Sequence, residues 1–222
     1  MKTFFLDRRD DIEERILGVD RGSLLIIGHS VGVNINLVDE LDMYSDILRR
    51  MSEYSRRMDI VIICGIVARV YRREYLSAVV IDRGKILGIS DMTHRVHGDM
   101  HYNLGASYRM YKTSLGTFSI VVGDDVYYPE VVRALSSEKS DAIVILAGEK
   151  SDERLKKVIS THSYLCGISV ICLSDGRAIV TNRHGDIVHS DVDAPCNMIL
   201  SRDMTFYRAL RSDIYDNVYI EE

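Results

Sequence analysis

The stretch that decides the fold reads Tyr111-Lys-Thr-Ser-Leu-Gly116-Thr-Phe-Ser-Ile-Val-Val-Gly123-Asp-Asp125-Val-Tyr-Tyr128-Pro129-Glu130-Val-Val-Arg133-Ala134-Leu135. After Gly116, the apolar run 117–122 is typical of a buried strand. Pro129 then stands where a helix can begin, since proline suits the first helical turn, and we expect this helix to reach about Ser137. The stretch therefore predicts a strand followed closely by a helix.

The rest of the sequence alternates between apolar runs and amphipathic stretches. Apolar runs predict strands over residues 24–27, 60–67, 75–81, 86–89, 141–147, 170–173, 178–181, 186–192 and 198–200. Helices are expected over 37–58, where apolar residues recur at spacings of three and four, and over 151–161. The alternation predicts an α/β fold with a mixed sheet or two sheets. No linker or repeat divides residues 1–222, so we expect one domain.

Composition excludes several classes of protein. The 222 residues are 46% apolar and 27% charged, which is the balance of a soluble globular chain and not of a disordered or fibrous one. The formal net charge of -5 gives no basic field that would attract nucleic acid. The sequence contains no stretch of about 18 uncharged apolar residues, so we predict no membrane span. The charged run Asp7–Asp11 cannot serve as the apolar region of a signal peptide.

The four cysteines, Cys64, Cys166, Cys172 and Cys196, form no Cys-x-x-Cys pair. The first three lie in apolar runs, and no secretory signal is recognisable. We therefore expect buried free thiols in a reducing cytoplasm and not a disulfide framework.

One short motif suggests a serine hydrolase. Gly28-His29-Ser30-Val31-Gly32 fits the Gly-x-Ser-x-Gly pattern of a nucleophile elbow, in which a strand-to-helix turn exposes the serine. Only 27 residues precede Gly28, too few for the strands and the oxyanion loop that such a hydrolase places upstream. Asp175 and His184 would complete a triad in the usual order, although acidic residues and histidines are common enough to arise there by chance.

A second motif groups three histidines. On a helix, the spacing of His94, His97 and His101 would place all three imidazoles on one face, which suits a divalent metal. Gly98 and the lack of an apolar stripe favour a polar surface loop instead. Both interpretations stay open.

The 111–135 stretch resembles the nitrilase, or carbon–nitrogen hydrolase, superfamily. In that family a glycine-containing turn leads into a strand that ends in Cys-x-Asp, followed by an aromatic-Pro-Glu sequence and a helix with Arg-x-Leu. The resemblance extends over most of residues 24–200. Further segments that resemble the family are Leu24–His29, Asp82–Gly88, Ser140–Leu146 and Ser174–Asp186. The resemblance implies an α-β-β-α sandwich of two mixed sheets.

The family's reaction needs a cysteine nucleophile, a glutamate that transfers its proton and a lysine that stabilises negative charge. The resemblance places Gly123 at the cysteine position and His29 at the glutamate position. The lysine position falls near Met92, and no lysine occurs between Lys85 and Lys112. Without these three groups, acyl transfer by the family's mechanism is chemically impossible. The segment between His29 and Ile60 also looks shorter than in the family.

The resemblance leaves a candidate pocket around the missing nucleophile. Its residues are His29, Ser30, His94, Asp124, Asp125, Tyr128 and Glu130. We expect no cofactor, although His29, His94 and Asp124 could hold a divalent metal together with His97 or His101.

These observations favour a non-catalytic ligand-binding or protein-interaction module. The alternative is an amide-type hydrolase or esterase with altered machinery, either Ser30 with His29 or His94 as base, or water bound to a metal at the histidines. Family members commonly pair through the helix after the nucleophile strand, which here carries Val131, Val132, Ala134 and Leu135. We therefore expect a homodimer, with no nucleic-acid or membrane partner.

Overall fold

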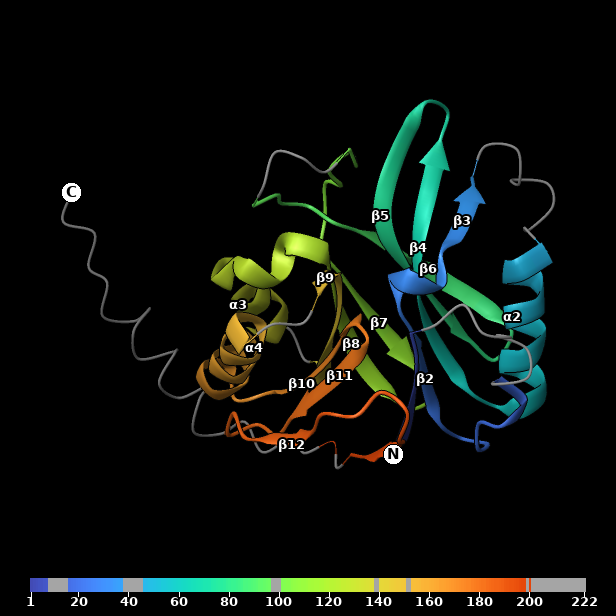
Figure 1. The fold of residues 1–222 in the computed structure, drawn as a ribbon. Coiled ribbons are helices and arrows are strands. Elements are labelled where there is room, and N and C mark those ends of the chain that lie inside the picture. The colour runs from blue at the N-terminus through green and yellow to red at the C-terminus, as the bar shows by residue number, and fades with distance from the viewer. Residues whose placement is uncertain are drawn as a thin grey trace, which may run out of the picture.

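The protein folds into two β-sheets that lie face to face, with helices against their outer faces (Figure 1). The computed structural model describes residues 1–7, 16–37, 46–96, 101–137, 140–150, 153–198 and 200. The layers run helix, sheet, sheet, helix, as the sequence predicts.

The first sheet has the strand order β13-β1-β2-β4-β5-β6, and β3 pairs with β4 beyond the end of β2. Its strands are β1 (Lys2–Leu6), β2 (Leu24–Ile27), β3 (Val33–Asn36), β4 (Val61–Val70), β5 (Arg73–Asp82), β6 (Lys85–Asp91) and β13 (Cys196–Asn197). β1, β2 and β4 are parallel neighbours, and β5 and β6 continue the sheet antiparallel. Helix α2 (Asp46–Met58) covers the outer face of this sheet (Figure 1).

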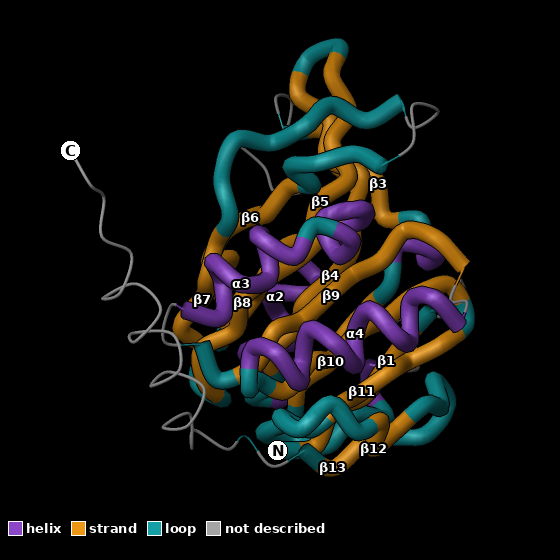
Figure 2. The backbone as a smooth tube through the Cα atoms, turned by 90° about the vertical axis from the view of Figure 1, so that its left-hand side faces the viewer, coloured by secondary structure: helices purple, strands orange, loops and turns teal. Residues whose placement is uncertain are grey.

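The second sheet has the order β12-β11-β10-β9-β8-β7. Its strands are β7 (Arg109–Thr113), β8 (Gly116–Val122), β9 (Ala142–Lys150), β10 (Ser169–Asp175), β11 (Arg177–Thr181) and β12 (Ile187–His189). β8, β9 and β10 run parallel, so their carboxyl ends share one edge. Figure 2 shows α3 (Pro129–Ser137) and α4 (Glu153–Cys166) side by side across the outer face of this sheet.

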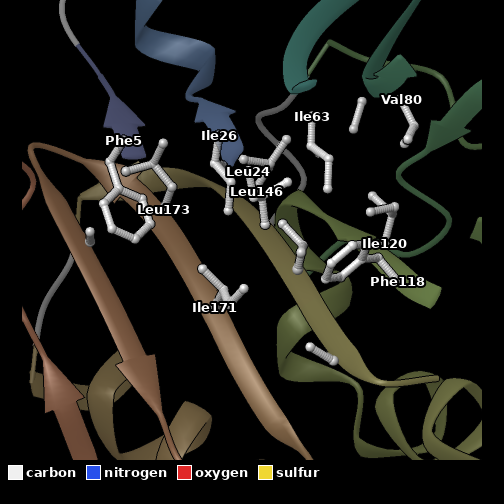
Figure 3. Close-up of a cluster of buried hydrophobic side chains, with 14 of the residues drawn as sticks. Phe5, Leu24, Ile26, Ile63, Val80, Phe118, Ile120, Leu146, Ile171 and Leu173 are labelled. Atoms are coloured by element: carbon white, nitrogen blue, oxygen red, sulfur yellow. The ribbon is translucent and has the colours of Figure 1, made fainter. Parts of the chain in front are cut away.

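The main core lies between the sheets. Figure 3 shows apolar side chains from both sheets meeting in this layer, among them Ile26 and Ile63 from the first sheet and Phe118 and Ile171 from the second. Alternate residues of each strand point the other way into two smaller cores, one under α2 and one under α3 and α4. Because the central strands are buried on both faces, their sequences are continuous apolar runs.

The sequence predictions fail at several boundaries. Strands β1, β3 and β7 were not predicted, and the strand expected over 198–200 is instead the short β13 at 196–197. α4 extends five residues beyond the predicted end and stops before Gly167, which has a φ of 60°. Of the helix expected over 37–58, only 46–58 is helical among the described residues, and 38–45 lie outside them.

Helix α3 directs most of its apolar side chains into the protein's own core. Val131, Val132 and Leu135 are buried in the core beneath the helix, and only Ala134 of the four predicted interface residues is exposed. These three side chains stabilise the protein's own fold, and Ala134 lies on the outer face of the helix.

All four cysteines are free and buried, in agreement with the sequence prediction. Burial raises the pKa of the Cys64 and Cys172 thiols to about 12, so neither is a thiolate at neutral pH. Among the described residues, no helix is long and apolar enough to span a bilayer.

The fold predicts that the layer between the sheets dominates stability. Phe118 is 0% exposed in that layer, so Phe118→Ala should lower the free energy of unfolding by about 3–5 kcal/mol through lost apolar burial and a residual cavity. The control Val188→Ala, on a side chain 55% exposed, should change it by less than about 0.5 kcal/mol. Urea unfolding measures both, and equal effects would contradict this packing.

Candidate functional site

The candidate site lies where strands of both sheets end. β2 leads into the short 3-10 helix η1 (His29–Val31), and β8 leads into a second, η2 (Gly123–Tyr127). The segment 92–96 follows β6 and lies beside η2. Parallel α/β sheets commonly place ligands at the carboxyl ends of their strands, because loops there bring side chains from several strands together.

Gly123 occupies a position that has neither a side chain nor room for one. Its φ of 57° is in the left-handed region, which glycine adopts without steric cost. A Cβ at this position would lie 2.6 Å from Met92 Sδ and 3.0 Å from Leu76 Cδ2. Met92 is 0% exposed, and the Asp124 N–H points at its sulfur at 3.5 Å. The Met92 side chain therefore fills the space beside Gly123.

Asp125 ties η2 to the segment after β6. Its carboxylate accepts hydrogen bonds from the Thr93 N–H at 2.9 Å, the Thr93 hydroxyl at 2.9 Å and the His94 N–H at 2.7 Å. Burial raises the pKa of this carboxyl, and the hydrogen bonds from Thr93 and His94 oppose that rise. Asp124 adds a bond from the Val96 N–H at 2.9 Å. The two carboxylates thus position Met92 indirectly, by fixing the backbone that follows it.

His94 lies between two tyrosine rings. Its imidazole stacks on Tyr128 at a centroid distance of 4.4 Å and on Tyr108 at 6.1 Å, and its Nδ1 lies 3.2 Å from Asp125 Oδ1. The Tyr128 hydroxyl donates to the Arg95 carbonyl at 2.7 Å. Glu130 is exposed in the first turn of α3 and takes no part in these contacts. These contacts hold the segment after β6 in place.

His29 is held as a neutral imidazole. Its Nε2 lies 2.9 Å from the Ser77 carbonyl, which only accepts hydrogen bonds, so Nε2 carries the proton and Nδ1 is an acceptor. Nδ1 is buried with no hydrogen-bond partner among the described residues. Burial lowers the pKa of His29 to about 4, against a smaller opposing effect of the Ser77 bond. The ring lies against Gly65, where a Cβ would come within 2.9 Å of it.

Ser30 does not form a nucleophile elbow. Its hydroxyl is directed at Asp7, donating to the Asp7 carboxylate and lying 3.0 Å from the Asp7 carbonyl. The φ of Ser30 is not positive, so Ser30 lacks the strained backbone that is typical of a nucleophile elbow. The motif instead forms η1. Because Gly28 has no side chain, the Asp7 carboxylate can occupy the space where a Cβ would lie.

A cavity of about 290 Å³ opens beside these residues. It is lined by Asp7, His29, Ser30, Val67, Leu76, Tyr102, Ala147, Gly148 and Asp175. Leu76 touches both this cavity and the space at Gly123, so the two lie next to each other. Of the predicted pocket residues only His29 and Ser30 line it. Sequence reasoning missed Asp7, and it considered Asp175 only as a possible triad member with Ser30 and not as part of the pocket.

The predicted histidine metal cluster is not assembled in the described residues. His97 lies outside them, His101 is exposed, and His94 is engaged by Asp125 and Tyr128. No group of three or more potential ligands gathers in the described part of the chain.

The layered sheets and the pocket at the carboxyl ends of their strands define a nitrilase-like sandwich, and solved structures share it. Nit3 from Saccharomyces cerevisiae, a member of branch 10 of the nitrilase superfamily, matches with a TM-score of 0.75 at 12% identity, over 96% of this chain and 94% of its own. A carbon-nitrogen hydrolase from Helicobacter pylori G27 matches with a TM-score of 0.71 at 16% identity, over 99% and 97% of the two chains.

An amidase from Nesterenkonia sp. AN1, solved in complex with butyramide, matches with a TM-score of 0.72 at 14% identity, over 99% of this chain and 97% of its own. At these identities the likeness concerns the fold alone. No curated protein matches the sequence. The model of the carbon-nitrogen hydrolase family, however, matches residues 33–166, which is more than half of the chain. The chain belongs to the carbon-nitrogen hydrolase family.

The packing at Gly123 predicts strong coupling between positions 123 and 92. Gly123→Ala should destabilise the protein by about 2 kcal/mol or more, because alanine is strained at positive φ and its Cβ collides with Met92. In a Met92→Ala background the collision disappears, so the same substitution should cost about 1 kcal/mol less. Urea unfolding of the four proteins measures the cycle, and purely additive effects would contradict the contact.

The low pKa of His29 predicts a pH-dependent loss of stability. Unfolding returns the pKa from about 4 to 6.5, so the unfolded chain binds more protons between these values and stability falls as the pH drops below 6.5. His29 should contribute up to about 3 kcal/mol of this loss. Buried His162, whose pKa is also lowered, acts in the same direction. Unfolding across this pH range should give a shallower slope for His29→Gln than for the wild type; equal slopes would refute the assignment.

Proposed function

We propose that the protein is a non-catalytic member of the carbon-nitrogen hydrolase family that acts as a ligand-binding or protein-interaction module. The observation that carries the proposal is the contact between Gly123 and Met92. The position that the resemblance assigns to the nucleophile has no side chain, and the sulfur of Met92 lies 2.6 Å from where a Cβ would begin. A substrate carbon cannot approach a reacting group there.

The surrounding chemistry supports the same conclusion. Acyl transfer needs an ionisable nucleophile, a group that takes its proton and a positive group for the developing oxyanion. A methionine thioether has no proton and no charge. His29 donates its Nε2 proton to the Ser77 carbonyl and stays neutral at physiological pH, so it supplies no positive charge.

The alternative, a hydrolase with altered machinery, finds less support. Ser30 would need an imidazole base at its hydroxyl, and that hydroxyl donates instead to the carboxylate of Asp7. A route through metal-bound water would need a ligand cluster, and none forms among the described residues.

Turnover assays test the proposal. Purified protein should hydrolyse no member of a panel of amides, nitriles, ureides and esters; the panel includes butyramide because the similar amidase is solved with it. Product release is measured by chromatography, with an active amidase as positive control. Hydrolysis that disappears in both Ser30→Ala and His29→Ala would overturn the proposal, and the two variants exclude a contaminating enzyme as its source.

The proposal includes a homodimer that pairs through the outer faces of α3 and α4. Most of the apolar residues of α3 point inward, so the apolar part of the dimer contact comes from exposed side chains of α4. Among these, Tyr164 is 55% exposed and Leu165 is 60% exposed. A cytoplasmic location stays a prediction from the sequence.

Sedimentation at micromolar concentration should give twice the 25.3 kDa mass of the chain. Leu165→Glu should shift the protein toward the monomer, because a buried carboxylate in an apolar contact is costly. The matched control Leu17→Glu, at a leucine 52% exposed outside α3 and α4, should leave the mass unchanged. A wild-type protein that sediments only as a monomer would refute the dimer.

A further inference from the structure

The second sheet ends in two strands that each have one neighbour. β7 and β12 stand at the two ends of its strand order, and Figure 2 shows them at opposite ends of the sheet. In the described part of the chain, no strand pairs with the outer edge of either one. Such an edge offers backbone N–H and C=O groups to a further strand. Both edges can therefore pair with a strand of another molecule.

The edge formed by β7 is basic. Arg109 and Lys112 are exposed on this strand, which contains no acidic residue. Lys85 is exposed on β6, the last strand of the first sheet, which lies beside β7 on the same side of the sandwich. Met110 adds apolar surface, since it is 39% exposed. A partner of this edge needs negative charge and some apolar surface.

The edge formed by β12 has the opposite character. Three exposed carboxylates flank the strand, one before it and two after it: Asp186, Asp191 and Asp193. The strand itself contains no lysine or arginine, and its first two side chains are apolar and exposed, Ile187 at 43% and Val188 at 55%. The Asp186 carboxylate accepts a hydrogen bond from the Asn182 side-chain amide at 2.9 Å, and this donor is uncharged.

The exposed side chains of the two edges also lie on the same face of the sheet. Tyr111 points into the layer between the sheets, so Met110 and Lys112 point to the face that carries α3 and α4. Ile187 lies opposite Thr181 of β11, on the same face as Ile179, which packs beneath those helices. A sheet that continued from one molecule into the next would bring these apolar side chains together.

We propose that β7 of one molecule pairs with β12 of a second copy of this chain, so that the second sheet continues from copy to copy. The basic side chains of β7 then meet the carboxylates that flank β12, and Met110 packs against the exposed apolar side chains of β12. Because the two edges differ, the contact is heterologous, and it can repeat along a chain of molecules.

The charges select this pairing over the symmetric ones. Two β7 edges would bring Arg109 and Lys112 against their own copies, and two β12 edges would bring carboxylates against carboxylates. Like charges on directly opposite residues of paired strands are destabilising, whereas opposite charges stabilise the pair. The same lysine and arginine that protect β7 from pairing with itself thus favour the acidic edge of β12.

This contact goes beyond the proposed function and is separate from the dimer proposed through α3 and α4, since it uses strand edges and not helix faces. Two short strands bury little surface, so the contact is weak, and we expect a Kd on the order of 100 µM. It should appear only at protein concentrations well above those at which the dimer is measured.

Sedimentation equilibrium of the full chain tests the contact. Between about 5 µM and about 500 µM, in about 25 mM NaCl, the weight-average mass should rise about twofold or more. In about 500 mM NaCl most of this rise should disappear, because salt screens charges at the surface. Each mass is compared with that of the same protein at 5 µM, so the result does not depend on the helix-mediated dimer. A mass that does not rise, or that rises equally at both salt concentrations, would overturn the proposal.

Charge reversal identifies the two edges. Lys112→Glu and Asp186→Lys should each abolish the rise, because each variant brings like charges together. An equal mixture of the two variants should recover it, since each variant supplies the edge that the other lacks. Recovery also requires both variants to be folded.

The matched control is Arg72→Glu, which makes the same change of charge at an exposed residue between β4 and β5 and should keep the rise of the wild type. Association that persists in both single variants, a mixture that does not associate, or an equal loss in Arg72→Glu would each overturn the proposal.

Discussion

The hydrogen bonds from the backbone of residues 93–96 to the carboxylates of Asp124 and Asp125 determine the candidate site. They join the end of β6 in one sheet to the end of β8 in the other. This junction fixes Met92, the residue just before the bonded segment, with its sulfur against Gly123. Burial destabilises the charged Asp125 carboxylate, and its hydrogen-bond donors offset that cost. Loss of any of these donors would therefore leave a buried carboxylate without its full set of partners and lower the stability of the fold. In the function that we propose, the motif that surrounds a nucleophile in the family here positions Met92 beside Gly123.

That packing divides the site into a filled part and an open part. Met92 and Leu76 close the space at Gly123, while the open cavity is lined by Leu76 as well. Its polar lining includes Asp7, Ser30 and Asp175. The filled space and the open cavity are therefore neighbours that share Leu76.

Local pattern was enough to predict much of this fold, because β2, β4, β8, β9 and β10 are buried on both faces and their apolar runs are unmistakable. The family resemblance then supplied the layer order and the placement of Gly123 near Met92. The sequence could not reveal the hydrogen bond between Asp7 and Ser30, or that Asp175 lines the same cavity. These positions are far apart in the chain, and only the order of the strands in the folded sheets brings them together. The sequence also could not tell that Val131, Val132 and Leu135 point from α3 into the protein's own core, since the apolar pattern of a helix does not name the surface that it meets.

The contact between Met92 and Gly123 can be measured directly in solution. In protein labelled with ¹³C at the methionine methyl groups, and with Met92 assigned through Met92→Leu, the Met92 methyl should show nuclear Overhauser effects to the Gly123 Hα protons and to a Leu76 methyl. It should also be shielded from a soluble paramagnetic probe, because Met92 is 0% exposed. A Met92 methyl without these effects and strongly relaxed by the probe would contradict the account, since the space beside Gly123 would then be open to a substrate.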